Sequence, residues 1–265
     1  MEDTLNLAMI EQGLNAGIIG RKILYLPSTT STMTVIREET ENGAVEGTVV
    51  IAEAQTNGRG RFNRPWISPP SCNLYLSILI RPRPDQLSHL NMAATVAVTR
   101  AIFRTTGLLS AIKWPNDIVI EKKKVAGILI ETYPDSNGLI YAVIGIGINV
   151  NFDPSSYPEI ASRVTSLRNE SGSTISRVKV IQTLLQEIDD LYRRIQNGEL
   201  PWIEWKNLLE TLGQQVRVEW HGTVEEGRAT DVDQEGSLIL ERIDGSVAVL
   251  PAGEVTFHLA GKFES

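Results

Sequence analysis

Apolar positions follow two different periods along this chain, and together they predict a mixed α and β protein. Short β-branched or continuously apolar runs predict buried strands, at 23–26, 48–54, 73–80, 111–120, 124–132 and 139–150. Apolar residues spaced three or four positions apart predict amphipathic helices, at 31–41, 87–106, 175–196 and 201–212. Strands mixed with helices over one sheet predict an α+β or α/β layer design. We expect the α+β form, a mixed sheet with helices on one side.

The pattern changes near residue 213, where helical periodicity stops. Short alternating runs separated by glycine turns then predict a small β-barrel, with strands at 216–220, 227–232, 237–241 and 247–250. This divides the chain into a helical lead-in at 1–21, a larger domain at 22–212 and a barrel at 213–265. A segment of about 50 residues is marginal by itself, so we expect it to pack on the larger domain.

Composition narrows the class of protein. The 265 residues carry a net charge of −7, which argues against general nucleic-acid binding because such binding needs a basic surface. A single cysteine, Cys72, excludes an intramolecular disulfide and favours the reducing cytoplasm. The acidic start of the chain is unlike a signal peptide, and no apolar run is long enough to predict a membrane span.

The segment Gly58–Trp66 carries the densest candidate chemistry, with three arginines, two glycines and a tryptophan between two predicted core strands. Glycine lets a backbone approach a ligand closely, arginine matches carboxylates or phosphates, and tryptophan offers a face for a planar ring. These properties predict a loop that closes over an anionic ligand bearing an aromatic base. The alternatives are a solvated basic loop or a local contact with nucleic acid.

Three further motifs are candidates for the same site: 113–117 (KWPND), 124–131 (KVAGILIE) and 145–151 (GIGINVN). Lys113–Asp117 breaks a predicted strand with a proline, so a turn with ordinary surface charges is the alternative. Lys124 opens an apolar strand, although one of three adjacent lysines is usually a solvated charge. The alternating glycines of the third motif leave one face of a strand bare for a ligand or for close packing.

Several common site classes are excluded. The third glycine of G-x-G-x-x-G is missing, and no phosphate-binding G-x-x-x-x-G-K-[ST] loop is present. The three histidines are scattered, so neither a Cys/His metal site nor a serine–histidine triad is supported. Catalysis by this chain would therefore rest on positioning and positive charge.

In their order along the chain, the motifs resemble those of the biotin protein ligases, the biotin–acetyl-CoA-carboxylase ligase family, over about residues 22–262. The matching segments are Ser31–Met33, Gln55–Arg61, Trp66, Lys113–Asp117, Lys124–Leu129 and Gly145–Asn149. The resemblance implies a class II synthetase-like catalytic domain followed by an SH3-like barrel. It also implies a monofunctional form that does not bind DNA, because only about 21 residues precede the first predicted core strand.

The resemblance implies an ATP-dependent, two-step ligase. Biotin and ATP, with Mg²⁺, would give biotinyl-5′-AMP and pyrophosphate. A lysine of the biotin carboxyl carrier protein of acetyl-CoA carboxylase would then take the biotinyl group and release AMP. A lipoate–protein ligase and a non-catalytic biotin or nucleotide sensor are the alternatives. A homodimer is compatible with the family, and no membrane partner is expected.

The resemblance also assigns residues to roles. The implied biotin-binding residues are Ser31, Thr32, Met33, Gln55, Gly58, Arg59, Gly60, Arg61, Lys124 and Gly127. The implied ATP- and adenylate-binding residues are Arg59, Arg61, Trp66, Lys113, Asn116, Lys124 and Asn149. Arg61, Lys124 and Asp117 are the implied catalytic residues, and Mg²⁺ would be held mainly by the ATP phosphates.

Two positions depart from the family pattern. Met33 stands where the family usually has asparagine, so an amide is replaced by packing and a soft sulfur. Asn63 replaces a common glycine in the loop, a mild change because asparagine tolerates left-handed backbone conformations.

Overall fold

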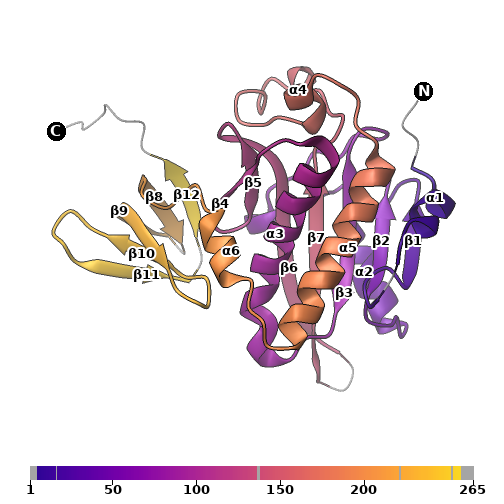
Figure 1. Ribbon diagram of the computed structural model, residues 1–265, viewed down its shortest axis with the longest axis horizontal. Helices are drawn as coiled ribbons and strands as arrows, with labels where there is room; N and C mark the ends of the chain where they lie inside the picture. Colours follow the sequence, from indigo (N-terminus) through magenta and orange to yellow (C-terminus); the bar gives the residue numbers. More distant parts are fainter. Residues whose placement is uncertain (1–4, 16, 136–137, 221, 252, 258–265) are drawn as a thin grey trace.

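A seven-stranded mixed sheet forms the larger part of the computed structural model, which describes residues 5–15, 17–135, 138–220, 222–251 and 253–257 (Figure 1). The strand order is β1-β2-β3-β7-β6-β5-β4. β1 runs parallel to β2, and every other neighbouring pair is antiparallel. The strands are β1 Lys22–Leu26, β2 Thr48–Ala52, β3 Leu74–Ile80, β4 Ala111–Lys113, β5 Asp117–Ile120, β6 Lys123–Pro134 and β7 Ile140–Ile148.

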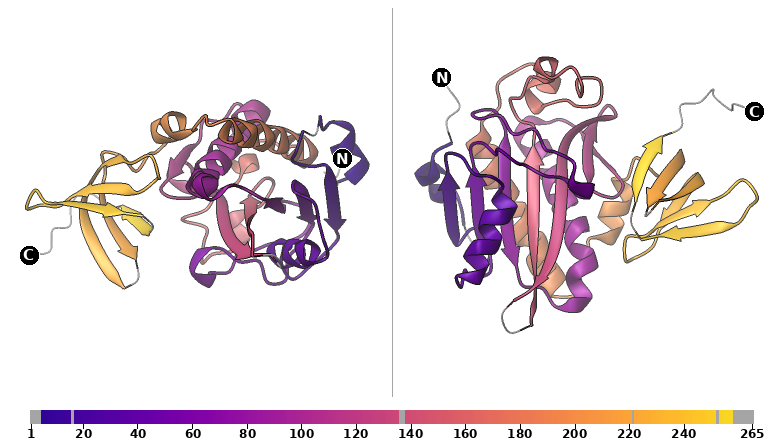
Figure 2. Two further views of the ribbon diagram at one scale, coloured as in Figure 1. Left: turned by 90° about the horizontal axis from the view of Figure 1, so that it is seen from below. Right: turned by 180° about the vertical axis from the view of Figure 1, so that it is seen from behind.

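Helices cover both faces of this sheet, unequally. α3 (Leu87–Thr106) and α5 (Arg177–Gln196) lie side by side on one face, while α2 (Thr32–Glu41) packs on the other (Figure 2, left). The two long helices follow the predicted arrangement, and α2 adds a helix on the second face. The shorter helical elements are α1 Leu7–Gln12, η1 Arg61–Asn63, η2 Pro84–Gln86, η3 Pro154–Ser156, α4 Leu167–Ser171 and α6 Trp202–Asn207.

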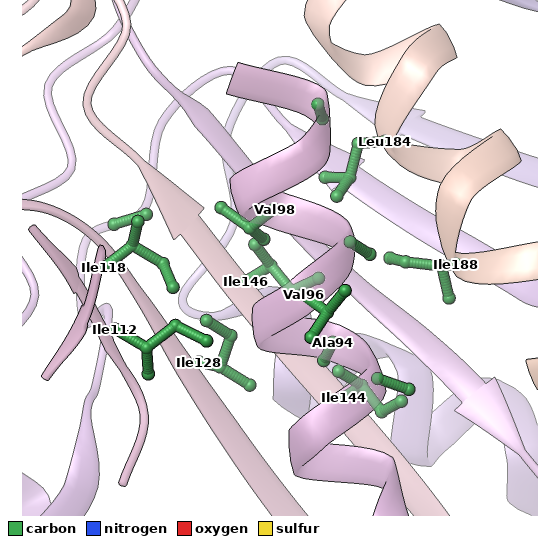
Figure 3. Packing of buried hydrophobic residues seen from close by; sticks show 14 of the residues in the cluster. Ala94, Val96, Val98, Ile112, Ile118, Ile128, Ile144, Ile146, Leu184 and Ile188 are labelled. Carbon is green, nitrogen blue, oxygen red and sulfur yellow. The ribbon is translucent and has the colours of Figure 1, made fainter. Parts of the chain in front are cut away.

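The main core lies between the sheet and the two long helices. β-branched side chains of the central strands meet small and apolar positions of α3, and α5 closes the layer (Figure 3). The residues labelled there are Ala94, Val96, Val98, Ile112, Ile118, Ile128, Ile144, Ile146, Leu184 and Ile188. α3 ends at Gly107, whose φ of 75° terminates the helix in the left-handed region that glycine tolerates. This buried layer makes the sheet a rigid support for its loops.

A five-stranded antiparallel sheet follows α6, in the order β11-β10-β9-β8-β12. Its strands are β8 Gln215–Trp220, β9 Thr223–Val232, β10 Leu238–Glu241, β11 Val247–Leu250 and β12 Glu254–Phe257. β9 starts earlier than the alternation predicted, and β12 was not predicted. The indole Nε1 of Trp114 donates to the Gly236 carbonyl (2.9 Å), and Lys206 pairs with Asp231 (2.6 Å), so this sheet packs on the larger part of the chain.

Two predicted elements are wrong in extent. The predicted strand 111–120 is divided into β4 and β5 because Pro115, after a cis peptide bond, cannot continue the ladder. The predicted helix 201–212 ends after Asn207 because the chain turns to pair with β4, where the Ile112 amide donates to the Leu208 carbonyl (2.8 Å). No helix in the described ranges is both long and apolar enough to cross a bilayer.

Candidate active site

A cavity of about 600 Å³ opens where the Gly58–Trp66 loop lies over strands β5, β6 and β7. The described residues Gly253 and Val255 of the C-terminal sheet also line it. All four motifs meet here. The sequence-predicted residues that line the cavity are Ser31, Thr32, Met33, Gln55, Arg59, Gly60, Arg61, Trp66, Lys113, Asn116, Asp117, Lys124, Gly127 and Asn149.

Gly58 was expected in the binding site, but it lies behind the cavity wall. A Cβ at position 58 would lie 2.6 Å from the Trp66 carbonyl oxygen and 2.7 Å from Ser68 Oγ. The Trp66 amide also donates to the Gly58 carbonyl (2.8 Å). Gly58 therefore lets the two ends of the loop approach each other, and its contribution to the site is indirect.

One part of the wall is polar and internally bonded. It is built by the start of α2 and by Gln55, which follows β2. The Thr32 amide donates to Gln55 Oε1 (2.9 Å), and Gln55 Nε2 donates to Ser68 Oγ (3.0 Å). Ser77 Oγ donates to Thr32 Oγ1 (2.8 Å), while Ser31 and Thr32 are both buried. These bonds fix the orientation of the Gln55 amide and hold a small set of donors and acceptors against the cavity.

The glycine face of β6 and β7 accommodates three larger side chains. A Cβ on Gly145 would lie 2.6 Å from Met33 Sδ, and a Cβ on Gly147 would lie 2.5 Å from Trp66 Cε2. A Cβ on Gly127 would lie 3.0 Å from the Cε atom of Lys124. The bare strand face is thus partly filled by the protein's own side chains, which form an apolar and aromatic wall.

The arginines of the loop are held by defined partners. Arg59 pairs with Glu131 of β6 (2.9 Å) at the edge of the cavity. Arg61 donates to Asn116 Oδ1 (3.2 Å) and to the carbonyl of Gly253 (2.9 Å), which links the loop to the C-terminal sheet. Both guanidinium groups are therefore pre-positioned at the site.

Lys124 and Asp117 lie on the facing wall. The Lys124 ammonium lies 2.5 Å from Asp117 Oδ1 and 5.1 Å from the centre of the Trp66 ring. Asn116 Nδ2 donates to the Ile128 carbonyl (2.6 Å), so the side chain of Asn116 bridges the loop and β6. Cations from two segments, Arg61 and Lys124, therefore line a single cavity.

Asn149 lines the cavity but is almost fully buried. Its Nδ2 donates to the Thr165 carbonyl (3.1 Å), and its backbone amide donates to the Val125 carbonyl (2.8 Å). The side-chain amide of Asn149 therefore holds segment 163–165 against β6 and β7.

One side of the cavity is built by a segment for which the sequence analysis predicts neither an element nor a site. Glu159, Ile160, Ser162, Arg163 and Val164 line this wall. The Lys124 amide donates to the Arg163 carbonyl (2.9 Å), and the Thr165 amide donates to the Lys124 carbonyl (2.9 Å). No local pattern marks this segment, because only its pairing with β6 brings it to the site. Lys122 also lines the cavity, although the sequence favoured Lys124 alone.

Cations outnumber acids at the cavity wall. The acidic side chains in the lining are Asp117 and Glu159, and the basic ones are Arg59, Arg61, Arg64, Lys113, Lys122, Lys124 and Arg163. Among the residues that the structure describes, no group of three or more His, Cys, Asp or Glu side chains is arranged to hold a metal ion. The site is thus suited to an anionic ligand with a planar ring.

Comparison with known proteins identifies related ligases. Residues 25–149 match the Biotin/lipoate A/B protein ligase family, and residues 211–257 match the Biotin protein ligase C terminal domain. The chain is 35% identical to the bifunctional ligase/repressor BirA of Bacillus subtilis over 246 residues, covering 91% of this chain and 76% of that protein. It is 32% identical to the biotin--[acetyl-CoA-carboxylase] ligase of Mycobacterium tuberculosis over 259 residues, covering 94% and 93%.

A solved structure extends the likeness to three dimensions. The biotin protein ligase from Aquifex aeolicus in complex with biotin and ATP superposes with a TM-score of 0.76 at 26% identity, covering 90% of this chain and 99% of that one.

Proposed function

The chain belongs to the biotin protein ligase family, and from that premise we propose that it activates biotin with ATP and transfers it to a carrier protein. The product of the first step would be biotinyl-5′-AMP, and the acceptor would be a lysine in the biotin carboxyl carrier domain of acetyl-CoA carboxylase. One observation carries this proposal: a single cavity joins the polar cluster at Thr32 and Gln55 to the cations Arg61 and Lys124.

The first step joins two anions. A carboxylate oxygen of biotin attacks the α-phosphorus of ATP, and the bond from that phosphorus to the oxygen bridging to the β-phosphate breaks. Pyrophosphate leaves with the electron pair of that bond. Arg61 and Lys124 would lower the repulsion between carboxylate and phosphate and stabilise the charge in the transition state.

Different parts of the cavity wall would hold the biotin ring and the adenine. We assign the ureido ring of biotin to Ser31, Thr32 and Gln55, whose fixed donors and acceptors suit a cyclic urea. We assign the adenine to the face of Trp66. A closed loop around the mixed anhydride would also keep water away from it.

The second step transfers the biotinyl group. The neutral amine of the carrier lysine attacks the carbonyl carbon, and the bond from that carbon to the phosphate oxygen breaks to release AMP with the electron pair of that bond. The nitrogen loses one proton to solvent as the amide forms. Asp117 would orient the incoming amine. Its contact with Lys124 at 2.5 Å puts its carboxylate next to the cation assigned to the reacting carboxyl group.

Mg²⁺ would arrive with the ATP phosphates. The cavity offers the scattered carboxylates Asp117 and Glu159, and Asp117 is paired with Lys124. The described residues therefore fit a nucleotide-borne Mg²⁺ better than a resident metal site.

Pyrophosphate release from ATP and Mg²⁺, with biotin or lipoate added, tests the proposal. Biotin-dependent release that falls at least tenfold in Arg61→Ala, but is kept in the surface control Arg217→Ala, is the expected result. Release with lipoate alone would assign the chain to lipoate ligation. Binding of biotin without any pyrophosphate release would identify a sensor built on this fold.

A further inference from the structure

The hairpin turn between β5 and β6 has an unusual backbone for its residues. Glu121 and Lys122 have φ values of 48° and 66°, so both lie in the left-handed region. Two-residue turns of this kind favour Asn-Gly, because residues with a Cβ are disfavoured there. A lysine at the second position therefore works against local backbone preference, and its side chain is exposed yet lines the cavity.

Two other cations line the same cavity from separate segments. Lys113 lies at the end of β4, directly opposite Asp117 in the β4–β5 register. Arg163 is brought to the site by the pairing of its carbonyl with the Lys124 amide (2.9 Å). Since Lys122 is two residues before Lys124, the turn and segment 163–165 both adjoin the start of β6, whereas β4 pairs with the neighbouring strand β5.

The acidic groups near these cations are Asp117, Glu159 and Glu210. Asp117 is paired with Lys124, and Arg163 Nη2 donates to the backbone carbonyl of Glu159 (3.2 Å), not to its carboxylate. Glu210 is not among the described residues that line the cavity; burial raises its pKa, while the nearby Lys113 and Lys122 lower it. Lys122 itself forms no ion pair with any carboxylate in the described ranges.

We propose that Lys122, together with Lys113 and Arg163, binds the β- and γ-phosphates of ATP and the pyrophosphate that leaves. This inference rests on the proposed function. Arg61 and Lys124 are assigned to the biotin carboxylate and the α-phosphate, so a second group of cations is needed where the remaining negative charge of ATP lies. As the bond to the α-phosphorus breaks, negative charge grows on the leaving group, and Lys122 stabilises it there.

The neighbouring lysine provides a matched control. Lys123 is exposed, carries the same charge and does not line the cavity, so Lys123→Gln reports the effect of net charge alone. Lys122→Gln removes the proposed contact. Lys122→Gly removes it too, but it relieves the backbone conformation of the turn, so its Tm should be equal to or roughly 2 °C above that of the unmodified chain.

Two assays then distinguish phosphate binding from a general effect on the site: steady-state adenylation, and transfer of biotin from preformed biotinyl-5′-AMP. Both Lys122 variants should raise KM for ATP and the inhibition constant of inorganic pyrophosphate about three- to fivefold, the upper range for one exposed charge contact. Biotin affinity and transfer from preformed biotinyl-5′-AMP should change by less than about twofold, because neither involves the β- and γ-phosphates. The difference from Lys123→Gln should shrink at high salt.

Equal effects of the Lys122 and Lys123 substitutions on KM for ATP and on pyrophosphate inhibition would overturn the inference. So would an equal loss in transfer from the preformed adenylate, since that would mean a general disturbance of the site. If the unmodified chain releases no pyrophosphate with biotin, the proposed function itself fails. Calorimetric titration with inorganic pyrophosphate then tests Lys122 directly, and unchanged binding in Lys122→Gly would reject the site.

Discussion

The indole of Trp66 lies so close to Gly147 that a Cβ at position 147 would be 2.5 Å from its Cε2 atom. Trp66 belongs to the arginine loop and Gly147 to the central strand β7, so this contact joins two cavity motifs that are far apart in the sequence. The glycine is required because any side chain at 147 would displace the ring.

Gly147→Ala should therefore destabilise the protein and weaken ATP binding. Overpacking of this kind costs about 1–3 kcal/mol, measurable as a lower free energy of unfolding in urea, and displacement of the indole should raise KM for ATP. For the free energy of unfolding alone, Gly60→Ala is the steric control, since its Cβ would lie 3.7 Å from the nearest atom, the Arg64 carbonyl oxygen.

A smaller ring provides a second test of the same contact. Trp66→Phe loses no hydrogen bond that the described residues make, because the buried indole Nε1 has no partner among them. In the Trp66→Phe background Gly147→Ala should cost less than in the unmodified chain. Additive losses of stability in the double variant would contradict a direct contact.

Met33 should tolerate an apolar replacement better than the amide usual in related proteins. Its side chain is 3% exposed and packs against Gly145, close to Leu129. Met33→Asn would bury an amide without evident partners, at about 1–3 kcal/mol, and should raise KM for biotin. Met33→Leu nearly conserves volume and should cost less than about 1.5 kcal/mol. Urea unfolding and biotin titration check both; a fully stable Met33→Asn would show that the pocket supplies partners.

The ion pair of Arg177 and Glu53 (2.7 Å) should matter more than surface pairs. Arg177 is fully buried and also donates to the Asn73 carbonyl (3.2 Å), so it joins the start of α5 to the strand ends beside the cavity. Arg177→Met leaves Glu53 without its cation and should lower the free energy of unfolding by about 3–5 kcal/mol. Arg217→Met, which breaks an exposed pair, should change it by less than about 1 kcal/mol. Similar losses in both variants would show that burial adds nothing to the first pair.

Cys72 should be an unreactive thiol. Burial raises its pKa to about 11, so little thiolate exists at pH 8.5. Iodoacetamide should alkylate it at least roughly tenfold more slowly than free cysteine at that pH. Alkylation at the rate of free cysteine would contradict the burial.

The raised pKa of Cys72 also makes the free energy of unfolding depend on pH. Between pH about 8.5, the ordinary value for a thiol, and pH about 11, the unfolded chain loses this proton before the folded one does. The unfolded state then binds fewer protons, so the free energy of unfolding should fall as pH rises through this window. Relative to Cys72→Ser, which does not titrate there, the unmodified chain should lose stability with pH; parallel pH profiles would contradict the shift.

Much of the fold could be predicted from local pattern. The apolar period of 87–106 and Gly107 predicted α3 and its end, and the β-branched run at 48–54 predicted β2. These signals are local, because side-chain periodicity reflects which face of an element is buried. The early start of β9 was missed because its first residues are exposed or half-buried and carry no apolar alternation, and β12 was not predicted.

Local sequence patterns were enough to identify the residue types that carry the chemistry: the arginine loop, Lys113–Asp117, Lys124 and the alternating glycines. How these residues are used depends on contacts that form only when the chain folds. In the folded chain, Gly58 packs against the other end of its loop, Lys124 pairs with Asp117, and Arg163 lies beside β6. Motifs record the chemical groups that a site needs, whereas contacts between segments distant in the chain depend on sheet register and packing, which no local window of sequence contains.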